Sequence, residues 1–147
     1  MRFRIAAGAA IAAALIVPLT SVDANAVSPV RFSYVQYDSP GSDTGSNKSL
    51  NAEYIVVKNY GKTARSLTGW TIRDPNGHVY KFGSFTLKAG RSVRLHTGRG
   101  RNSQSDVYWR HDWYVWNNTG DKATLKNKAR ATVDTCRWGD GDGNAPC

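Results

Sequence analysis

The stretch that decides the fold runs from residue 67 to residue 121 and is punctuated by tight turns. It reads LTGW at 67–70, FTLKAG at 85–90, HTG at 96–98 and VWNNTGD at 115–121. Each segment is the end of a strand-like run followed by Gly or Asn, residues that accept the positive φ values of tight turns. Turn signals about every 8–12 residues are typical of a β-sandwich or barrel.

Alternating apolar and polar residues extend this pattern in both directions along the chain. YIVV at 54–57 has the composition of a central strand, and DPNG at 74–77 favours a hairpin because Asn-Gly accepts the turn's positive φ values. We expect strands at residues 30–37, 52–58, 67–73, 78–82, 92–97, 106–109, 123–126 and 131–135. Residues 38–49 are predicted to form a loop, and no helix is expected after residue 26. The sequence thus predicts an all-β chain of about eight or nine short strands.

The first 26 residues have the pattern of a secretory signal peptide. A basic head, MRFR, precedes an apolar run at 5–19, and Ala24 and Ala26 supply the small residues of a cleavage site. The run is shorter than the roughly 20 residues of a spanning helix. We therefore expect a secreted, extracellular domain comprising residues 27–147. The leader carries two arginines and one aspartate, so its removal lowers the formal net charge of +9 by one.

The only two cysteines, Cys136 and Cys147, lie near the C-terminus. An exported chain meets an oxidising compartment, which favours a disulfide between them. In the chain-entropy model such a bridge contributes roughly 3 kcal/mol. We predict that it closes the tail at 136–147, with the acidic sequence DGDGN at 140–144 as a flexible turn rather than a calcium loop, since no glutamate follows at the twelfth position.

An ordered series of segments resembles the lamin tail domain, an immunoglobulin-like β-sandwich. The series is NAEYIVVKN at 51–59, LTGWTIRD at 67–74, YKF at 80–82, FTL at 85–87 with Gly90, HTG at 96–98, VWNN at 115–118 and GDKATL at 120–125. The resemblance covers residues 51–138, and residues 30–37 supply the first strand. It implies a non-catalytic interaction module, and similar bacterial domains occur in exported proteins. The chain carries neither a coiled-coil rod nor an attached catalytic domain, so lamin partners do not carry over.

The sequence lacks the residue combinations that catalysis needs. Glu53 is the only glutamate, so a glycosidase carboxylate pair would need aspartates from loops. No nucleophile elbow, zinc-protease motif or phosphate loop is present. His78, His96 and His111 lie on different predicted hairpins, and neighbours such as His111 and Asp112 point to opposite faces of a strand. We expect no enzyme, no cofactor and no metal site, and a hydrolase is the least favoured function.

The charge pattern is the remaining sequence feature that indicates a ligand. Basic residues cluster at 91–101 and 122–137, with aromatic residues at 108–109 and 113–114. Such surfaces bind single-stranded nucleic acid through phosphate contacts and stacking. The hypothetical binding residues are Arg94, Arg99, Arg101 and Lys122, with Trp109 and Trp113 as stacking platforms.

The sequence leaves four interpretations of this surface open, one of which is a dedicated carbohydrate site that stacks aromatic side chains on sugar rings. In the other three, it serves an anionic polymer (extracellular DNA, a cell-wall polymer or an acidic glycan), it belongs to a structural or protein-interaction domain whose partner is another secreted protein, or it only keeps the domain soluble. Trp70 and Trp116 are assigned to the core, where a buried tryptophan contributes much apolar area. The sequence does not determine the oligomeric state.

Overall fold

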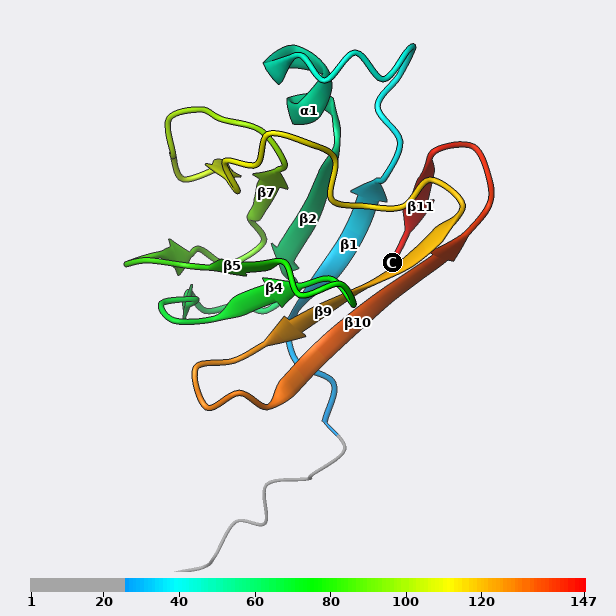
Figure 1. The fold of residues 1–147 in the computed structure, drawn as a ribbon. Coiled ribbons are helices and arrows are strands. Elements are labelled where there is room, and N and C mark those ends of the chain that lie inside the picture. Colours follow the sequence, from blue (N-terminus) through cyan, green and yellow to red (C-terminus); the bar gives the residue numbers. More distant parts are fainter. Residues whose placement is uncertain (1–25) are drawn as a thin grey trace, which may run out of the picture.

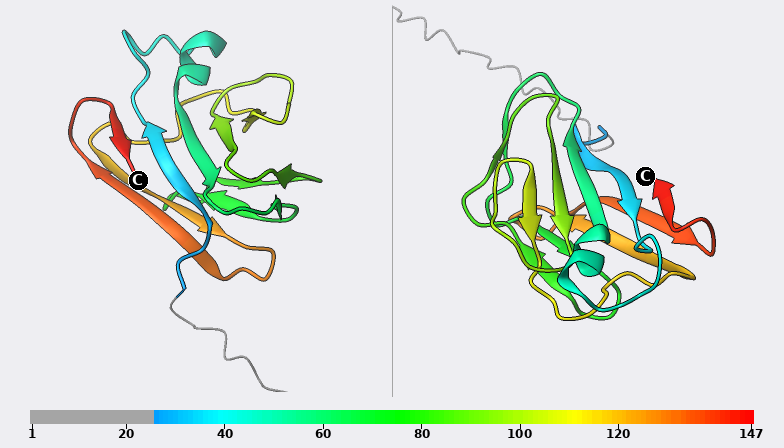
Figure 2. Two further views of the ribbon diagram at one scale, coloured as in Figure 1. Left: turned by 180° about the vertical axis from the view of Figure 1, so that it is seen from behind. Right: turned by 90° about the horizontal axis from the view of Figure 1, so that it is seen from above.

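Eleven strands and one short helix make up residues 26–147, the part of the chain that the computed structural model describes (Figure 1). The strands pack as a two-layered sandwich (Figure 2), which confirms the predicted all-β, immunoglobulin-like class. The elements are β1 (Val30–Gln36), α1 (Asn47–Ala52), β2 (Tyr54–Asn59), β3 (Arg65–Ser66), β4 (Thr71–Arg73), β5 (Val79–Lys81), β6 (Thr86–Leu87), β7 (Ser92–His96), β8 (Asp106–Tyr108), β9 (Gly120–Lys126), β10 (Thr132–Gly139) and β11 (Asn144–Pro146).

The two layers are a five-stranded and a four-stranded sheet. The first has the order β11-β1-β2-β7-β8, the second β10-β9-β4-β5, and β3 pairs with β6 in a separate two-stranded ribbon. All pairs are antiparallel except β7 with β8. In Figure 1 the four-stranded sheet lies in front of β1, β2 and β7. Its outer face therefore points away from the five-stranded sheet.

The core lies between the sheets and is built by alternation. Ile55 of β2 and Leu95 of β7 face Ile72 of β4 and Leu125 of β9, and none of these side chains is more than 1% exposed. Burying apolar surface contributes about 25 cal/mol per Å², so this layer fixes which strand residues point inward. Trp116 is buried, as the sequence predicts, whereas Trp70 is half-buried at the margin of the core.

The predicted hairpin at 74–77 is present and joins β4 to β5. The Asp74 carboxylate accepts hydrogen bonds from the backbone N–H of Asn76 (3.1 Å) and of His78 (2.7 Å). Gly77 has φ +94°, a conformation that side chains with a Cβ seldom adopt. Asp, Asn and Gly thus act here as the turn chemistry requires.

The prediction of no helix in the domain is wrong, because α1 begins in the segment expected to be a loop and continues to Ala52, where a strand was expected to begin. Ser46 is its N-cap and accepts a hydrogen bond from Ser49 N (3.3 Å), while Leu50 is buried. One capped turn with one buried side chain is too short to show the periodicity of an amphipathic helix. Within residues 26–147, no helix has the length and apolarity needed to cross a bilayer.

The sequence predicts a tail closed by the disulfide around a turn at 140–144, but it predicts no strand there. Residues 144–146 form β11, which pairs with β1 in the register Gln36 with Asn144 and Tyr34 with Pro146. The turn before β11 is anchored because Gly143 O accepts hydrogen bonds from Tyr37 N (2.9 Å) and Asp38 N (3.0 Å). β11 pairs with the edge of β1 that β2 does not cover. A sequence pattern does not show which strand has such an edge. The short strand β3 was also missed, whereas its partner β6 falls in the strand-like run at 85–87 that the sequence indicated.

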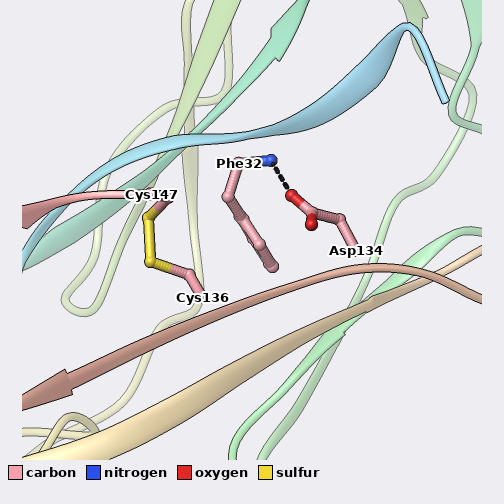
Figure 3. Close-up of a disulfide and its surroundings, with 4 residues drawn as sticks. All are labelled: Phe32, Asp134, Cys136 and Cys147. Carbon is pink, nitrogen blue, oxygen red and sulfur yellow. Dashed lines mark hydrogen bonds between the residues drawn. A yellow bond between two sulfur atoms is a disulfide. The ribbon is translucent and has the colours of Figure 1, made fainter. Parts of the chain in front are cut away.

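The tail also closes one side of the sandwich (Figure 3). The predicted disulfide joins Cys147, beyond β11, to Cys136 of β10, with their Cα atoms 5.2 Å apart. Beside it, the Asp134 carboxylate of β10 accepts a hydrogen bond from Phe32 N of β1 at 2.8 Å. The register shifts near Phe32 in β1 and near Asp134 in β10, so one irregularity supplies the acceptor for the other. The predicted signal peptide at 1–26 lies almost entirely outside the described residues.

Glu53, the residue just before β2, is a buried acid. Its side chain is fully buried, and its Oε1 accepts hydrogen bonds from Thr97 Oγ1 (2.5 Å) and Val115 N (2.9 Å). Within the described chain, Oε2 has no hydrogen-bond partner. Burial raises the pKa of the Glu53 carboxyl from its ordinary value of 4.5 to about 7, although the hydrogen bonds act to lower it.

Removing the disulfide tests its role in holding β11. A Cys136→Ser/Cys147→Ser variant should lose about 2–4 kcal/mol of unfolding free energy, measured by urea denaturation. Reduction of the native protein should give a similar loss, and the serine variant serves as the control because it should not respond to the reductant. Equal stability of the native and serine proteins would contradict the role that we assign to the bridge.

Replacing Glu53 with Gln tests the buried acid. The Glu53 carboxyl has a pKa of about 7 in the folded chain and 4.5 in the unfolded chain. Its contribution to folding stability is therefore fully present below pH 4.5 and is lost as the pH rises through about 7. The unfolding free energy of Glu53→Gln relative to the native protein should therefore rise over this window, by at most about 3 kcal/mol. Urea denaturation from about pH 4 to about pH 8 measures the difference, and a pH-independent difference would refute the assignment.

Candidate anion-binding face

The outer face of the four-stranded sheet carries a set of basic side chains. Ile72 of β4 and Leu125 of β9 point into the core, so Arg73 and Lys126, their neighbours along the strands, point out. The same alternation and the adjoining β9–β10 turn place seven cations on this side. We call this set the basic face: Arg73, Lys81, Lys122, Lys126, Lys128, Arg130 and Arg137.

The strand register sets the spacing of these cations. Thr71 of β4 lies directly between Lys81 of β5 and Lys126 of β9. Neighbouring strands are about 4.8 Å apart, so the two lysines start about 10 Å from each other with a hydroxyl between them. Lys122 and Arg137 lie directly opposite each other on β9 and β10. Like charges in directly opposed positions destabilise a sheet.

The carboxylates of β9 and β10 are used for backbone hydrogen bonds. Asp121 accepts from Lys122 N (2.8 Å) and Asn117 N (3.1 Å), and Asp134 accepts from Phe32 N. The ion pairs of residues 26–147 are His78–Asp74, His96–Asp106 and Arg99–Asp112. No cation of the basic face has an acidic partner among the described residues.

Four of the cations surround one hollow at the β5 side of this face. The basic hollow is lined by Gly69, Thr71, Arg73, Val79, Lys81, Lys128 and Arg130. Gly69 has φ +78°, and a Cβ there would come within 3.2 Å of Lys128 Cγ. The glycine therefore lets the aliphatic part of Lys128 lie close against the β4 end of the hollow.

Two arginines of the hollow have unusual local surroundings. Arg73 Nε is buried and has no hydrogen-bond partner within the described residues. Arg130 has φ +67°, a left-handed conformation that glycine adopts readily and other residues seldom do. Its turn is held by hydrogen bonds from Arg130 N to Asn127 O (2.9 Å) and from Ala131 N to Asn127 Oδ1 (3.0 Å). Conformational strain of this kind is frequent at functional sites.

The structure divides the four basic residues singled out from the sequence between opposite sides of the sandwich. Lys122 belongs to the basic face. Arg94 lies on β7 of the five-stranded sheet, where its guanidinium carbon is 5.5 Å from the centre of the Tyr54 ring. Arg99 and Arg101 follow β7, and Arg99 Nη2 is paired with Asp112 Oδ1 at 2.6 Å. These four residues therefore do not share one surface.

The two predicted stacking residues also have different environments. Trp109 is half-buried, with its ring 5.6 Å from that of Trp116, and adds to the margin of the core. Trp113 is 63% exposed, and its ring lies so close to Gly45 that a Cβ there would be 2.6 Å away. Only Trp113 thus presents a free aromatic surface, and it lies outside the basic face.

Of the residues considered for catalysis, Glu53 and Asp112 are engaged elsewhere, and two histidines meet. Glu53 is inside the core, and Asp112 is paired with Arg99. His111 does meet His78, with ring centres 4.9 Å apart, and His78 Nδ1 is 2.6 Å from Asp74 Oδ2. Burial, with the nearby His78, lowers the pKa of His111. Across residues 26–147, no three His, Cys, Asp or Glu side chains are grouped so that they could hold a metal ion.

The main residues that sequence reasoning missed are Arg73 and Lys81. They are far from the basic clusters along the chain, and only the pairing of β4 with β5 and β9 brings them beside Lys126. A signal was nevertheless present, because a hairpin at 74–77 with Ile72 inward places Arg73 and Lys81 on the outer face.

Comparison with known proteins identifies the domain. The family model for the Lamin Tail Domain matches residues 23–140. This range includes every strand of the four-stranded sheet and ends just before β11. The comparison with curated proteins gave no match.

The strain at Arg130 gives a prediction for stability. Arg130→Gly should raise the unfolding free energy by about 1 kcal/mol, because glycine accepts the positive φ. Arg130→Ala is the matched control, since it removes the guanidinium and keeps the strained conformation. Thermal denaturation should show only the glycine variant melting at a higher temperature. If the alanine variant gained as much, charge repulsion rather than backbone strain would be the cause.

Proposed function

The chain belongs to the Lamin Tail Domain family, and we propose that it is an exported, non-catalytic binding module that holds an anionic polymer on its basic face. This family is an immunoglobulin-like and generally non-catalytic interaction fold. The polymer classes that suit the face are extracellular DNA, a phosphate-bearing cell-wall polymer and an acidic glycan. The single observation that carries the proposal is the set of seven cations on one sheet face without an acidic partner among residues 26–147.

The electrostatics favour a polymer over a single small anion. A polyanion keeps a layer of condensed counterions, and each Lys or Arg that replaces a counterion adds entropy to binding. The strands β9 and β10 are seven and eight residues long, which corresponds to roughly 23–27 Å at 3.3 Å per residue. A surface of this length matches several repeats of a charged chain.

The opposed pair of Lys122 and Arg137 supports the same proposal. Without a ligand the two cations repel each other across β9 and β10. An anionic group that lies over both removes the repulsion and adds two attractive contacts. The binding free energy therefore includes relief of a strain that the free domain carries.

A triple substitution tests the proposal. The Lys122→Gln/Lys126→Gln/Arg137→Gln variant should bind single-stranded DNA or a poly(glycerol phosphate) at least ~10-fold more weakly at low salt. For DNA, the slope of log affinity against log salt should fall by about 2, since each single-strand phosphate contact contributes about 0.7. Fluorescence anisotropy at two salt concentrations measures both quantities on the purified protein with its disulfide intact.

The matched control removes the same number of cations from the opposite sheet, as Arg31→Gln/Lys58→Gln/Arg94→Gln. These three residues lie on β1, β2 and β7, and the variant should keep the native affinity and salt slope. Equal losses in both variants would mean that net charge alone drives binding. If no anionic polymer binds, the proposal fails and a protein-interaction domain is the alternative that stands.

A further inference from the structure

We infer that the basic hollow is a subsite for one phosphate group, so that the proposed polymer is one that carries phosphate. This inference rests on the proposed function for the identity of the polymer. The hollow itself can be tested separately with small anions. The observations that carry it are the charge around the hollow, the two arginines and the shape of its wall.

The charge around the hollow suits a phosphate better than a carboxylate. Arg73, Lys81, Lys128 and Arg130 line it, and no acidic residue does. A phosphate monoester carries about −1.5 to −2 at neutral pH and three strong acceptor oxygens. A carboxylate has two oxygens and a single charge, so it leaves more of this positive charge uncompensated than a terminal monoester does. An internal phosphodiester also carries a single charge, and its preference over a carboxylate rests on the arginines.

The two arginines add directional recognition. A guanidinium has its N–H groups in a planar fork that matches two phosphate oxygens at once. Arg73 is held on β4, which is paired on both sides by β5 and β9. Its buried Nε lacks a hydrogen-bond partner among residues 26–147. A change of the Arg73 side-chain rotamer would bring this N–H to a bound oxyanion, which would supply the missing acceptor.

Arg130 approaches the hollow from the β9–β10 turn. The positive φ at Arg130 is maintained by two hydrogen bonds with Asn127, one to its carbonyl and one to its side chain. A glycine at this position would satisfy the same turn without strain. Arg130 lines the hollow together with Lys128, so the turn brings two cations to it.

The wall of the hollow accommodates the atoms that flank a phosphate in a polymer. Thr71 contributes a hydroxyl, and Val79 is 42% exposed beside the cations. An apolar side chain next to a phosphate subsite can pack against the carbon atoms of the adjoining sugar or polyol unit. A free inorganic ion would use only the polar part of this wall.

Titration with small anions tests the subsite directly. At constant ionic strength, NMR shifts of residues 69–81 and 127–131 should saturate with inorganic phosphate and with pyrophosphate at a concentration at least ~10-fold lower than with acetate. Arg73→Gln/Arg130→Gln should abolish this saturation. Arg31→Gln/Lys58→Gln, on the opposite sheet, should leave it unchanged. Equal affinities for phosphate and acetate, or equal losses in both variants, would overturn the inference.

Arg73 lies within a central strand, so its substitution could abolish phosphate binding by unfolding the protein. A second variant avoids this ambiguity. Lys81→Gln/Lys128→Gln changes two exposed side chains of the same hollow and should weaken phosphate binding at least ~5-fold while the circular dichroism spectrum stays native. A folded Lys81→Gln/Lys128→Gln protein with native phosphate affinity would refute the subsite.

Polymer competition separates the two proposals. An oligodeoxynucleotide should bind more tightly than a polyglutamate of equal charge, and inorganic phosphate should displace it in part. If a 5′-phosphorylated oligonucleotide binds more tightly than the unphosphorylated one, the hollow holds a terminal monoester. If the two bind equally, the hollow holds an internal diester. Equal binding of oligonucleotide and polyglutamate refutes the phosphate subsite and leaves the polymer function intact. Phosphate binding without polymer binding refutes the polymer function and leaves the subsite.

Discussion

The sandwich depends on how the edge of β1 is joined to β10 across the gap between the two sheets. A strand edge presents unpaired N–H and C=O groups that must be covered or left to water. Here β11 covers residues 34–36, Cys147 N donates to Ser33 O at 3.1 Å, and the Asp134 carboxylate accepts from Phe32 N. The disulfide then makes the arrangement covalent. The same contacts position β10, and with it the cations at the edge of the basic face.

The basic face is a consequence of the core. In a strand, successive side chains point to opposite faces, and a register slip of one residue exchanges the two sets. Burial of Ile72 and Leu125 thus determines that Arg73 and Lys126 lie outside, and no slip that exposed the apolar residues could compete in free energy. Position on the outer face is therefore as well determined as the fold.

Local features of the fold could be predicted from the sequence, and non-local ones could not. The Asn-Gly hairpin, the disulfide and the buried Trp116 follow from the chemistry of a few neighbouring residues. The cation clusters were instead judged by proximity along the chain, which grouped Arg94 with Arg99 and Arg101. Sheet pairing groups cations differently, because it brings Lys81 and Lys126 to either side of Thr71 across 45 residues of sequence. The strand β11 was missed for a similar reason, since its partner is the first strand of the domain.

The cost of the basic face to the free domain depends on salt, and this dependence is opposite in sign to that of polyanion binding. Repulsion between exposed cations such as Lys122 and Arg137 is screened as ionic strength rises, because the Debye length falls from about 30 Å at 0.01 M to about 8 Å at 0.15 M. The free domain therefore becomes more stable with added salt, whereas polyanion binding by counterion release becomes weaker. The buried Glu53 contributes nothing to either trend, since its proton is held by desolvation inside the core rather than by surface charge. With added salt, the stability of the free domain and its affinity for a polyanion thus change in opposite directions. This pair of responses distinguishes a charged binding surface from charge that only keeps a domain in solution.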